Sequence, residues 1–270
     1  MAIKISCVII TLNEEENIRR SLNAVKWCDE IIVVDSGSDD KTIAICNEYK
    51  CKVYHKDFNG YGEQKRYTVS LANNDWVLNI DADEVVSAEL RHEIENIFNN
   101  GMINYNGFAL PRSLFFLGKK FKYGKESKEY YIRLFNKNFG DFSWDKVHEK
   151  VELDGEYKKL IGELYHFSYL NIEQYFRKFN SYTTKAAKAL HDKGKKGRSP
   201  TTIVFSFPVY LFKNYFVNRN FLNGIPGFLW ALFSSLYPVI KYFKLWSYRV
   251  KKSDESNPSS PPGRGRRSSR

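Results

Sequence analysis

Apolar stretches of strand length alternate with amphipathic stretches of helical period through the first 100 residues of the chain. Thr11 and Glu14 have the spacing of a capping box before the first helix. The pattern predicts strands over residues 3–11, 31–35, 53–54 and 76–80. It predicts helices over residues 18–25, 43–49, 64–72 and 87–99. This repeated βαβ order predicts an α/β fold, a Rossmann-like and mostly parallel sheet with helices on both faces.

The second part of the chain has a different pattern. Residues 107–111 and 131–136 are predicted strands, separated by an aromatic and basic loop. We expect residues 101–170 to extend the sheet. A helical pattern returns at residues 171–191, and a basic linker that contains glycine follows.

Residues 201–250 are dense in Phe, Tyr, Leu and Trp, and the run 220–240 has no charged residue. Its 21 residues are enough for a spanning helix, but its glycines and prolines argue against one. Flanking lysines and arginines, together with the aromatic residues, favour helices in the membrane interface. Packing in a protein core and true spanning remain alternatives. We predict a helical, amphipathic membrane-interface region over 171–252 and a disordered basic tail over 253–270.

The chain is basic, with 42 Lys and Arg against 31 Asp and Glu. This excess favours anionic partners such as acidic lipids, phosphorylated sugars or nucleic acid, and it does not choose among them. Four cysteines lack metal-site spacing and are expected to be reduced thiols. The amino terminus lacks a secretory signal pattern, so we expect a cytoplasmic protein.

Oxygen-bearing side chains gather where three predicted strands end. Carboxylates in such a cluster need a cation or hydrogen-bond donors to offset their repulsion. Because ligands of parallel sheets bind at the carboxyl ends of the strands, we expect one shared crevice. The residues concerned are Thr11, Asn13, Glu14, Asp35, Asp81, Asp83 and Glu84.

Such a crevice can accommodate a sugar nucleotide. Asp35 and the segment of Thr11 and Asn13 can accept a hydrogen bond from the base. Asp81 and Asp83 can hold the ribose and a divalent cation, Mg²⁺ or Mn²⁺. Lys65 and Arg66 can add positive charge near the phosphates, or they can be solvated surface residues.

Other binding motifs are missing from the sequence. There is no third glycine at Rossmann dinucleotide spacing, no P-loop and no GxSxG elbow. Aromatic residues interleaved with lysines between Leu114 and Tyr123 could stack on single-stranded nucleic acid or grip a glycolipid. We expect no nucleic-acid partner, and we keep nucleic-acid binding as the third hypothesis.

Three segments carry a resemblance to a known family. TLNEEENI, VVDSGSDDKT and DWVLNIDADE resemble the inverting family 2 glycosyltransferases with the GT-A fold, across the first 100 residues. GYGEQKR, WDKVHEKV, FLNGIPGFLWAL and KYFKLW resemble the lipopolysaccharide core glucosyltransferase subgroup. The resemblance implies that Asp35 contacts the base, Asp81 the ribose or diphosphate, and Asp83 the metal. It makes residues 1–100 the nucleotide-sugar half of the GT-A domain and residues 101–170 the acceptor and catalytic half.

Inversion by direct displacement requires one general base near the acceptor hydroxyl. The ED pair that often supplies it in the family is missing here, so the candidates are Glu149 and Asp145 in WDKVHEKV. We favour Glu149, with His148 holding the metal or the phosphate. A structural histidine and a surface salt bridge are the alternative interpretations of His148 and Glu149. Glu84 is expected to orient the site.

These observations predict a peripheral enzyme on the cytoplasmic face of the inner membrane. It would transfer a hexose, glucose from UDP-glucose, to a lipopolysaccharide core or related glycolipid acceptor. A transferase that acts on polyprenyl phosphate would use the same donor site. A nonenzymatic membrane-associated scaffold is the alternative from another class.

Overall fold

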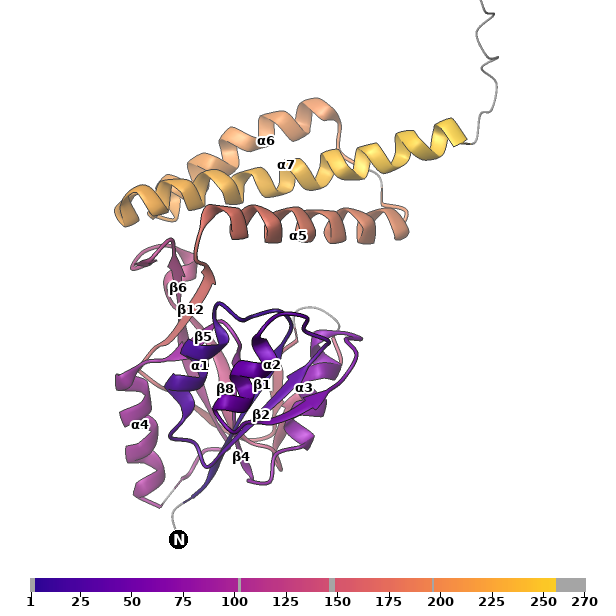
Figure 1. The fold of residues 1–270 in the computed structure, drawn as a ribbon. Helices are drawn as coiled ribbons and strands as arrows, with labels where there is room; N and C mark the ends of the chain where they lie inside the picture. The colour runs from indigo at the N-terminus through magenta and orange to yellow at the C-terminus, as the bar shows by residue number, and fades with distance from the viewer. Residues whose placement is uncertain (1–2, 102, 146–148, 196, 256–270) are drawn as a thin grey trace, which may run out of the picture. The chain divides into compact units, whose positions relative to one another are not determined.

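The computed structural model describes residues 3–101, 103–145, 149–195 and 197–255. The chain divides into two compact units, Met1–Leu170 and Asn171–Arg270 (Figure 1). We describe each unit by itself.

The first unit is built on a ten-stranded mixed sheet with the main order β3-β2-β1-β4-β8-β6-β12-β5, and β7 and β11 pair with β6. Four strands at one end run parallel: β1 (Ile5–Thr11), β2 (Glu30–Asp35), β3 (Lys52–His55) and β4 (Trp76–Asp81). The other strands are β5 (Glu84–Val86), β6 (Gly107–Phe116), β7 (Lys119–Lys120), β8 (Glu129–Asn136), β11 (Tyr157–Lys159) and β12 (Leu164–Tyr169). A separate antiparallel pair consists of β9 (Gly140–Phe142) and β10 (Val151–Leu153).

Helices cover both faces of this sheet. Leu22 of α1 and Leu90 of α4 pack with Ile9 in one buried cluster, whereas Val69 of α3 packs with Val8 in another. Val8 and Ile9 are neighbours on β1 and therefore point to opposite faces. The predicted α/β fold is confirmed. The helices of the unit are α1 (Ile18–Val25), α2 (Thr42–Glu48), α3 (Tyr61–Ser70), α4 (Ala88–Asn99) and the 3₁₀ turn η1 (Lys125–Ser127).

The capping box predicted at Thr11 and Glu14 is wrong. Helix α1 begins only at Ile18, and its N-cap residue Asn17 makes no side-chain cap. The reason is that Thr11 is still paired with Asp35 in the sheet, so the chain turns after it, with Asn13 at a positive φ of 54°.

The second unit is helical. It contains α5 (Ile172–Asp192), α6 (Pro200–Phe212), the π-helical turn η2 (Lys213–Val217), the 3₁₀ turn η3 (Asn220–Asn223) and α7 (Gly224–Glu255). Helix α7 packs against both α5 and α6 (Figure 1). The apolar run 220–240 does form a helix beyond η3, with Pro238 inside α7.

None of the helices in the described ranges is long and apolar enough to cross a membrane. Residues 253–255 continue α7, so the predicted tail does not begin at residue 253. Residues 256–270 of that tail lie outside the described residues.

Candidate active site

The carboxyl ends of β1, β2 and β4 lie side by side, as the sequence pattern predicts. Thr11 pairs with Asp35 on one side of β1, and Ile10 pairs with Asp81 on the other. Two interstrand spacings therefore separate the backbones of the two aspartates, about 10 Å. Paired residues of parallel strands share a face and consecutive residues alternate, so Asp35 and Asp81 point to opposite faces of the sheet.

Asp35 stabilises the turn that follows β2. Its Oδ2 accepts hydrogen bonds from the backbone N–H groups of Gly37 at 2.7 Å and Ser38 at 2.8 Å, and its Oδ1 accepts one from Ser38 Oγ at 2.5 Å. The residue is buried. The carboxylate is thus held in its own turn and does not face an open crevice in this structure, unlike the sequence-based expectation.

The loop after β1 is joined to the same turn. Asn13 donates from its backbone N–H to Ser38 Oγ at 2.8 Å, and its Oδ1 accepts from the N–H of Asp39 at 3.0 Å. Glu14 donates from its N–H to Thr42 Oγ1 at 2.9 Å. Thr11 Oγ1 is buried and has no hydrogen-bond partner among the described residues. Two predicted loops of the site are therefore brought together by side-chain to backbone contacts.

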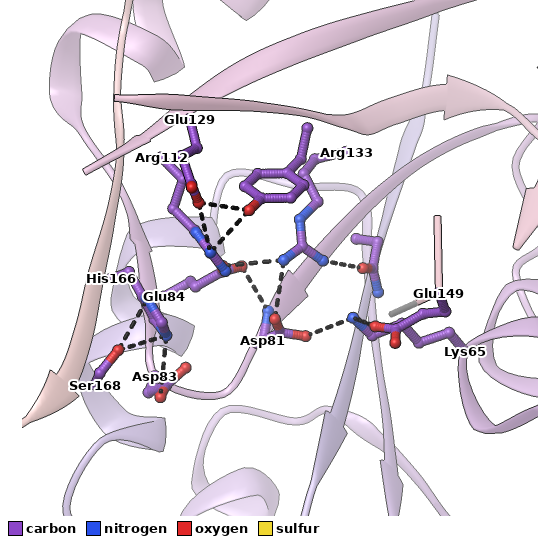
Figure 2. A network of polar contacts seen from close by, with 12 residues as sticks. Lys65, Asp81, Asp83, Glu84, Arg112, Glu129, Arg133, Glu149, His166 and Ser168 are labelled. Atoms are coloured by element: carbon purple, nitrogen blue, oxygen red, sulfur yellow. Dashed lines mark hydrogen bonds and ion pairs between the residues drawn. The ribbon is translucent and has the colours of Figure 1, made fainter. Parts of the chain in front are cut away.

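A network of buried charges lies at the end of β4 (Figure 2). Lys65 Nζ is 2.9 Å from Asp81 Oδ1 and 2.8 Å from Glu149 Oε1, and the Lys65 side chain is only 4% exposed. Lys65 comes from α3 and Glu149 from the segment before β10. The predicted donor-site aspartate and the predicted base are thus joined through one ammonium group.

Arg133 completes this network from the neighbouring strand β8. Its guanidinium donates to Asn79 Oδ1 at 2.7 Å, Asp81 Oδ2 at 2.9 Å and Glu84 Oε1 at 3.0 Å. Glu84 is fully buried, and its Oε2 accepts from the backbone N–H of Asp81 at 2.9 Å. Glu84 therefore orients Asp81 through the backbone and through Arg133.

The charges of the network set the protonation states. Burial raises the pKa of Asp81, but the positive charges of Arg133 and Lys65 outweigh burial and hold that pKa well below its usual range. Burial lowers the pKa of Arg133, and the carboxylates of Asp81 and Glu84 raise it above its usual value by more. Asp81 is therefore ionised at neutral pH, and each of its oxygens is paired with a cation.

Asp83 and His166 form a second polar group at the same end of β4. His166 Nε2 on β12 is 3.5 Å from Asp83 Oδ2, and the Ser168 hydroxyl is within 2.9 Å of the imidazole nitrogens (Figure 2). The backbone N–H of Phe167 donates to the Asp83 carbonyl at 2.8 Å. Mn²⁺ binds both carboxylate and imidazole ligands, whereas Mg²⁺ prefers the carboxylate. The described residues contain no cluster of three His, Cys, Asp or Glu side chains suited to a metal.

Two predicted site residues, Arg66 and Asp145, are not part of these networks. Arg66 is 3.0 Å from Asp141 and its guanidinium lies 4.4 Å from the centre of the Trp144 ring. The exposed Asp145 accepts a hydrogen bond from Ser143 Oγ at 2.9 Å. His148 lies outside the described residues. Of the two predicted bases, the structure joins Glu149 and not Asp145 to Asp81.

Sequence reasoning missed Arg133 and His166. Arg133 has a signal, because a charged residue between Ile132 and Leu134 in a predicted strand must be paired if that strand is buried. His166 has a weaker one, since its strand β12 was not predicted. Its position beside Asp83 follows from the pairing of β12 with β5, where His166 lies opposite Glu84.

The chain is similar to several known proteins. Residues 6–147 match the family model described as glycosyl transferase family 2. An uncharacterized glycosyltransferase of Rickettsia typhi is 36% identical over 92% of this chain and 88% of its own length. The lipopolysaccharide core biosynthesis glycosyltransferase LpsC of Rhizobium meliloti is 27% identical over 92% of this chain and 94% of its own. The crystal structure of S. aureus TarS 1-349 in complex with UDP is 13% identical, covers 92% of each chain and has a TM-score of 0.43.

The match to the family model spans more than half of the chain, and it includes the three strand ends described above. The similarity to the Rickettsia protein extends over both structural units. The expectations of a GT-A-like fold and of a glycosyltransferase are confirmed. The chain is a member of glycosyl transferase family 2.

Proposed function

We propose that this glycosyltransferase moves a hexose, glucose from UDP-glucose, with inversion onto a lipopolysaccharide core or related glycolipid acceptor. The observation that carries the proposal is the chain of contacts from Asp81 through Lys65 to Glu149. One buried ammonium group contacts both Asp81 and Glu149, which supports Asp81 as a donor-site carboxylate and Glu149 as the general base. The relative named for lipopolysaccharide core biosynthesis supports this class of acceptor.

In the proposed reaction the oxygen of the acceptor hydroxyl attacks the anomeric carbon. The bond from that carbon to the diphosphate oxygen breaks, and its electron pair leaves with UDP. The hydroxyl proton moves to Glu149, whose Oε1 lies 2.8 Å from Lys65 Nζ. Such a positioned base contributes about 10²–10⁴-fold to the rate.

On the donor side we assign the base-binding region to the Asn13 and Asp35 loops and the ribose or diphosphate to Asp81. Asp83 and His166 would hold Mg²⁺ or Mn²⁺, and the bound cation would offset the charge that develops on the diphosphate. Lys65 contacts Asp81 and Glu149, so one of its three N–H groups remains to interact with the diphosphate. Arg66 is turned toward Asp141 in this structure, so we assign no donor contact to it.

The assay uses purified full-length protein, radiolabelled UDP-glucose, Mn²⁺ and two acceptors, truncated lipopolysaccharide core and polyprenyl phosphate. We expect transfer to the core acceptor. Glu149→Gln should lower kcat by about 10²-fold or more, with little change in the KM for donor. Asp145→Asn, in the same segment, is the matched control and should retain activity.

The outcomes separate the alternatives. Transfer to polyprenyl phosphate alone would replace the proposed acceptor. Equal losses in the Glu149 and Asp145 variants would remove the assignment of the base. Failure of the wild-type protein to hydrolyse or transfer any UDP-sugar would favour a scaffold. For the same protein we propose a peripheral location on the cytoplasmic face of the inner membrane.

A further inference from the structure

The turn that joins α6 to α7 has a polar interior. Asn220 and Asn223 are each 1% exposed. Asn220 donates from Nδ2 to the Asn214 carbonyl at 2.9 Å, and Asn214 donates from its own Nδ2 to Ser235 Oγ at 2.9 Å. Asn223 Nδ2 donates to Asn220 Oδ1 at 3.2 Å. The polar groups of this turn are therefore satisfied inside the protein.

The outer surface of the same region is apolar. Phe205 is 73% exposed, and Val209, Phe212 and Phe216 are also exposed and follow it at helical spacing. Ile225, at the start of α7, is 76% exposed. We call these five residues the apolar face.

The apolar face is joined to the turn by ring contacts. The ring centroids of Phe212 and Phe216 are 5.2 Å apart, and those of Phe216 and Phe221 are 6.2 Å apart. Phe221 is exposed as well. The surface is thus continuous from α6 into η3. This region has large apolar side chains on its outside and hydrogen-bonded amides inside, which is the reverse of the arrangement that water favours. Hydrocarbon favours it, because lipid offers no hydrogen bonds to polar groups.

The charge around the apolar face identifies its partner. From Lys193 to Ser253 the sequence has eleven Lys and Arg residues and no Asp or Glu. Lys213 and Arg219, which lie beside the face in sequence, are both exposed. This combination of aromatic and aliphatic side chains with unopposed cations matches the boundary between anionic headgroups and acyl chains. A second copy of the chain would bring two sets of these cations together.

We propose that the apolar face inserts into the headgroup and acyl boundary of an anionic lipid bilayer, with Lys213 and Arg219 at the lipid phosphates. The inserted element is the hairpin of α6 and α7. The inference goes beyond glycosyl transfer and does not depend on the donor site.

The test is flotation of the full-length protein with vesicles of phosphatidylcholine, with and without phosphatidylglycerol. The test variant combines Phe205→Ser, Phe212→Ser and Ile225→Ser, all at exposed positions. Its matched control combines Phe58→Ser, Phe139→Ser and Ile161→Ser, which are exposed in the first unit, Ile161 by 79%. Circular dichroism and thermal unfolding verify that both variants are folded.

We expect wild type and control to float with vesicles that contain phosphatidylglycerol. The apolar-face variant should lose at least about tenfold in its partition coefficient, because three side chains no longer enter the acyl region. Replacing Lys213 and Arg219 by Gln should remove the preference for phosphatidylglycerol and the dependence on salt.

Two results would overturn the proposal. One is equal flotation of the apolar-face variant and the wild type. The other is a wild-type protein that does not float and that is a dimer in gel filtration, together with an apolar-face variant that is a monomer. UDP-sugar hydrolysis without vesicles is measured in parallel. A protein that floats but does not act on the donor would refute the proposed function alone.

Discussion

Replacing Arg133 by Met tests the buried charge network most directly. Arg133 is buried and its guanidinium bonds to Asn79, Asp81 and Glu84. Met fills much of the same volume but offers no donor. The change leaves Glu84, which is fully buried, with the Asp81 N–H and the more distant Arg112 at 3.6 Å.

The expected loss follows from this geometry. Removing one partner of a buried ion pair costs about 3–5 kcal/mol, because the remaining charge stays buried without compensation. For a unit of 170 residues, each kcal/mol lowers Tm by about 2–4 °C. We therefore expect Tm to fall by about 6–20 °C. The loss of about 3–5 kcal/mol is a large part of the free energy of unfolding of an ordinary protein, about 5–15 kcal/mol.

The free energy of unfolding is measured by urea denaturation followed by far-ultraviolet circular dichroism. The matched control is Arg91→Met, which removes a half-buried ion pair with Glu95 one helical turn away at 2.8 Å. Ion pairs between residues four apart on a helix contribute about 0.3–0.5 kcal/mol. The two substitutions are chemically identical, so their difference reports burial and pairing.

A double variant separates charge from packing. Glu84→Gln combined with Arg133→Met removes both charges and retains an oxygen for the Asp81 N–H. It should be more stable than Arg133→Met alone, because no unpaired carboxylate remains at residue 84. Equal losses in Arg133→Met and Arg91→Met, or a double variant less stable than either single change, would refute the reasoning.

Three further predictions concern pH, packing and the metal. The pKa of Asp81 is lowered in the folded state, so the contribution of Asp81 to stability is complete above the unfolded pKa of about 3.9 and declines as pH falls below that value. Below this pH the urea midpoint of the wild type should fall with pH, and the midpoint of Arg133→Met should fall less steeply. Gly62→Ala should lower kcat, because a Cβ would lie 2.3 Å from the Ser143 carbonyl in the segment that leads to the proposed base. Gly197→Ala should not lower it, because that Cβ would meet only side-chain atoms at ordinary contact distances of 3.6 Å and 4.0 Å. Equal kcat values in the two variants would contradict this. Mn²⁺ with UDP should raise the Tm of wild type but not of Asp83→Asn, and an equal rise would exclude Asp83 as a ligand.

The central strands were predictable because they are buried on both faces. Such strands are continuous apolar runs, and the predicted 31–35 and 76–80 differ by one residue from Glu30–Asp35 and Trp76–Asp81. Helix α3 begins at Tyr61, three residues before the predicted start at residue 64. Gly62 is helical, and its missing side chain makes room for the carbonyls of Ser143 and Asp145.

The short strands could not be predicted in the same way. Strands β5, β9, β10 and β11 have three residues each, too few for a periodic pattern. Their positions depend on partners far along the chain, as in the pairing of β5 with β12. Local sequence contains no information on such a partner. This is also why His166, which β12 brings to Asp83, was missed.

The charge network illustrates the same limit. That Asp81 ends a strand can be read from one segment, but its contact with Arg133 depends on the register of β8 against β4, in which Leu134 lies opposite Leu78. A slip of one residue would turn Arg133 to the other face. The sequence therefore predicted the carboxylates and Lys65 as site residues, and only tertiary structure supplies Arg133.

The opposite orientations of Asp35 and Asp81 restrict how a nucleotide can bind. Asp35 shares its face with Thr11, and Asp81 shares its face with Ile10. A ligand that contacts both aspartates cannot lie on one face of the sheet and must cross the end of β1. The loop that begins after Thr11 and is held by Ser38 lies at this end. In the proposed binding mode, a single donor would therefore lie across the end of β1, from the Asp35 turn to the Asp81 network.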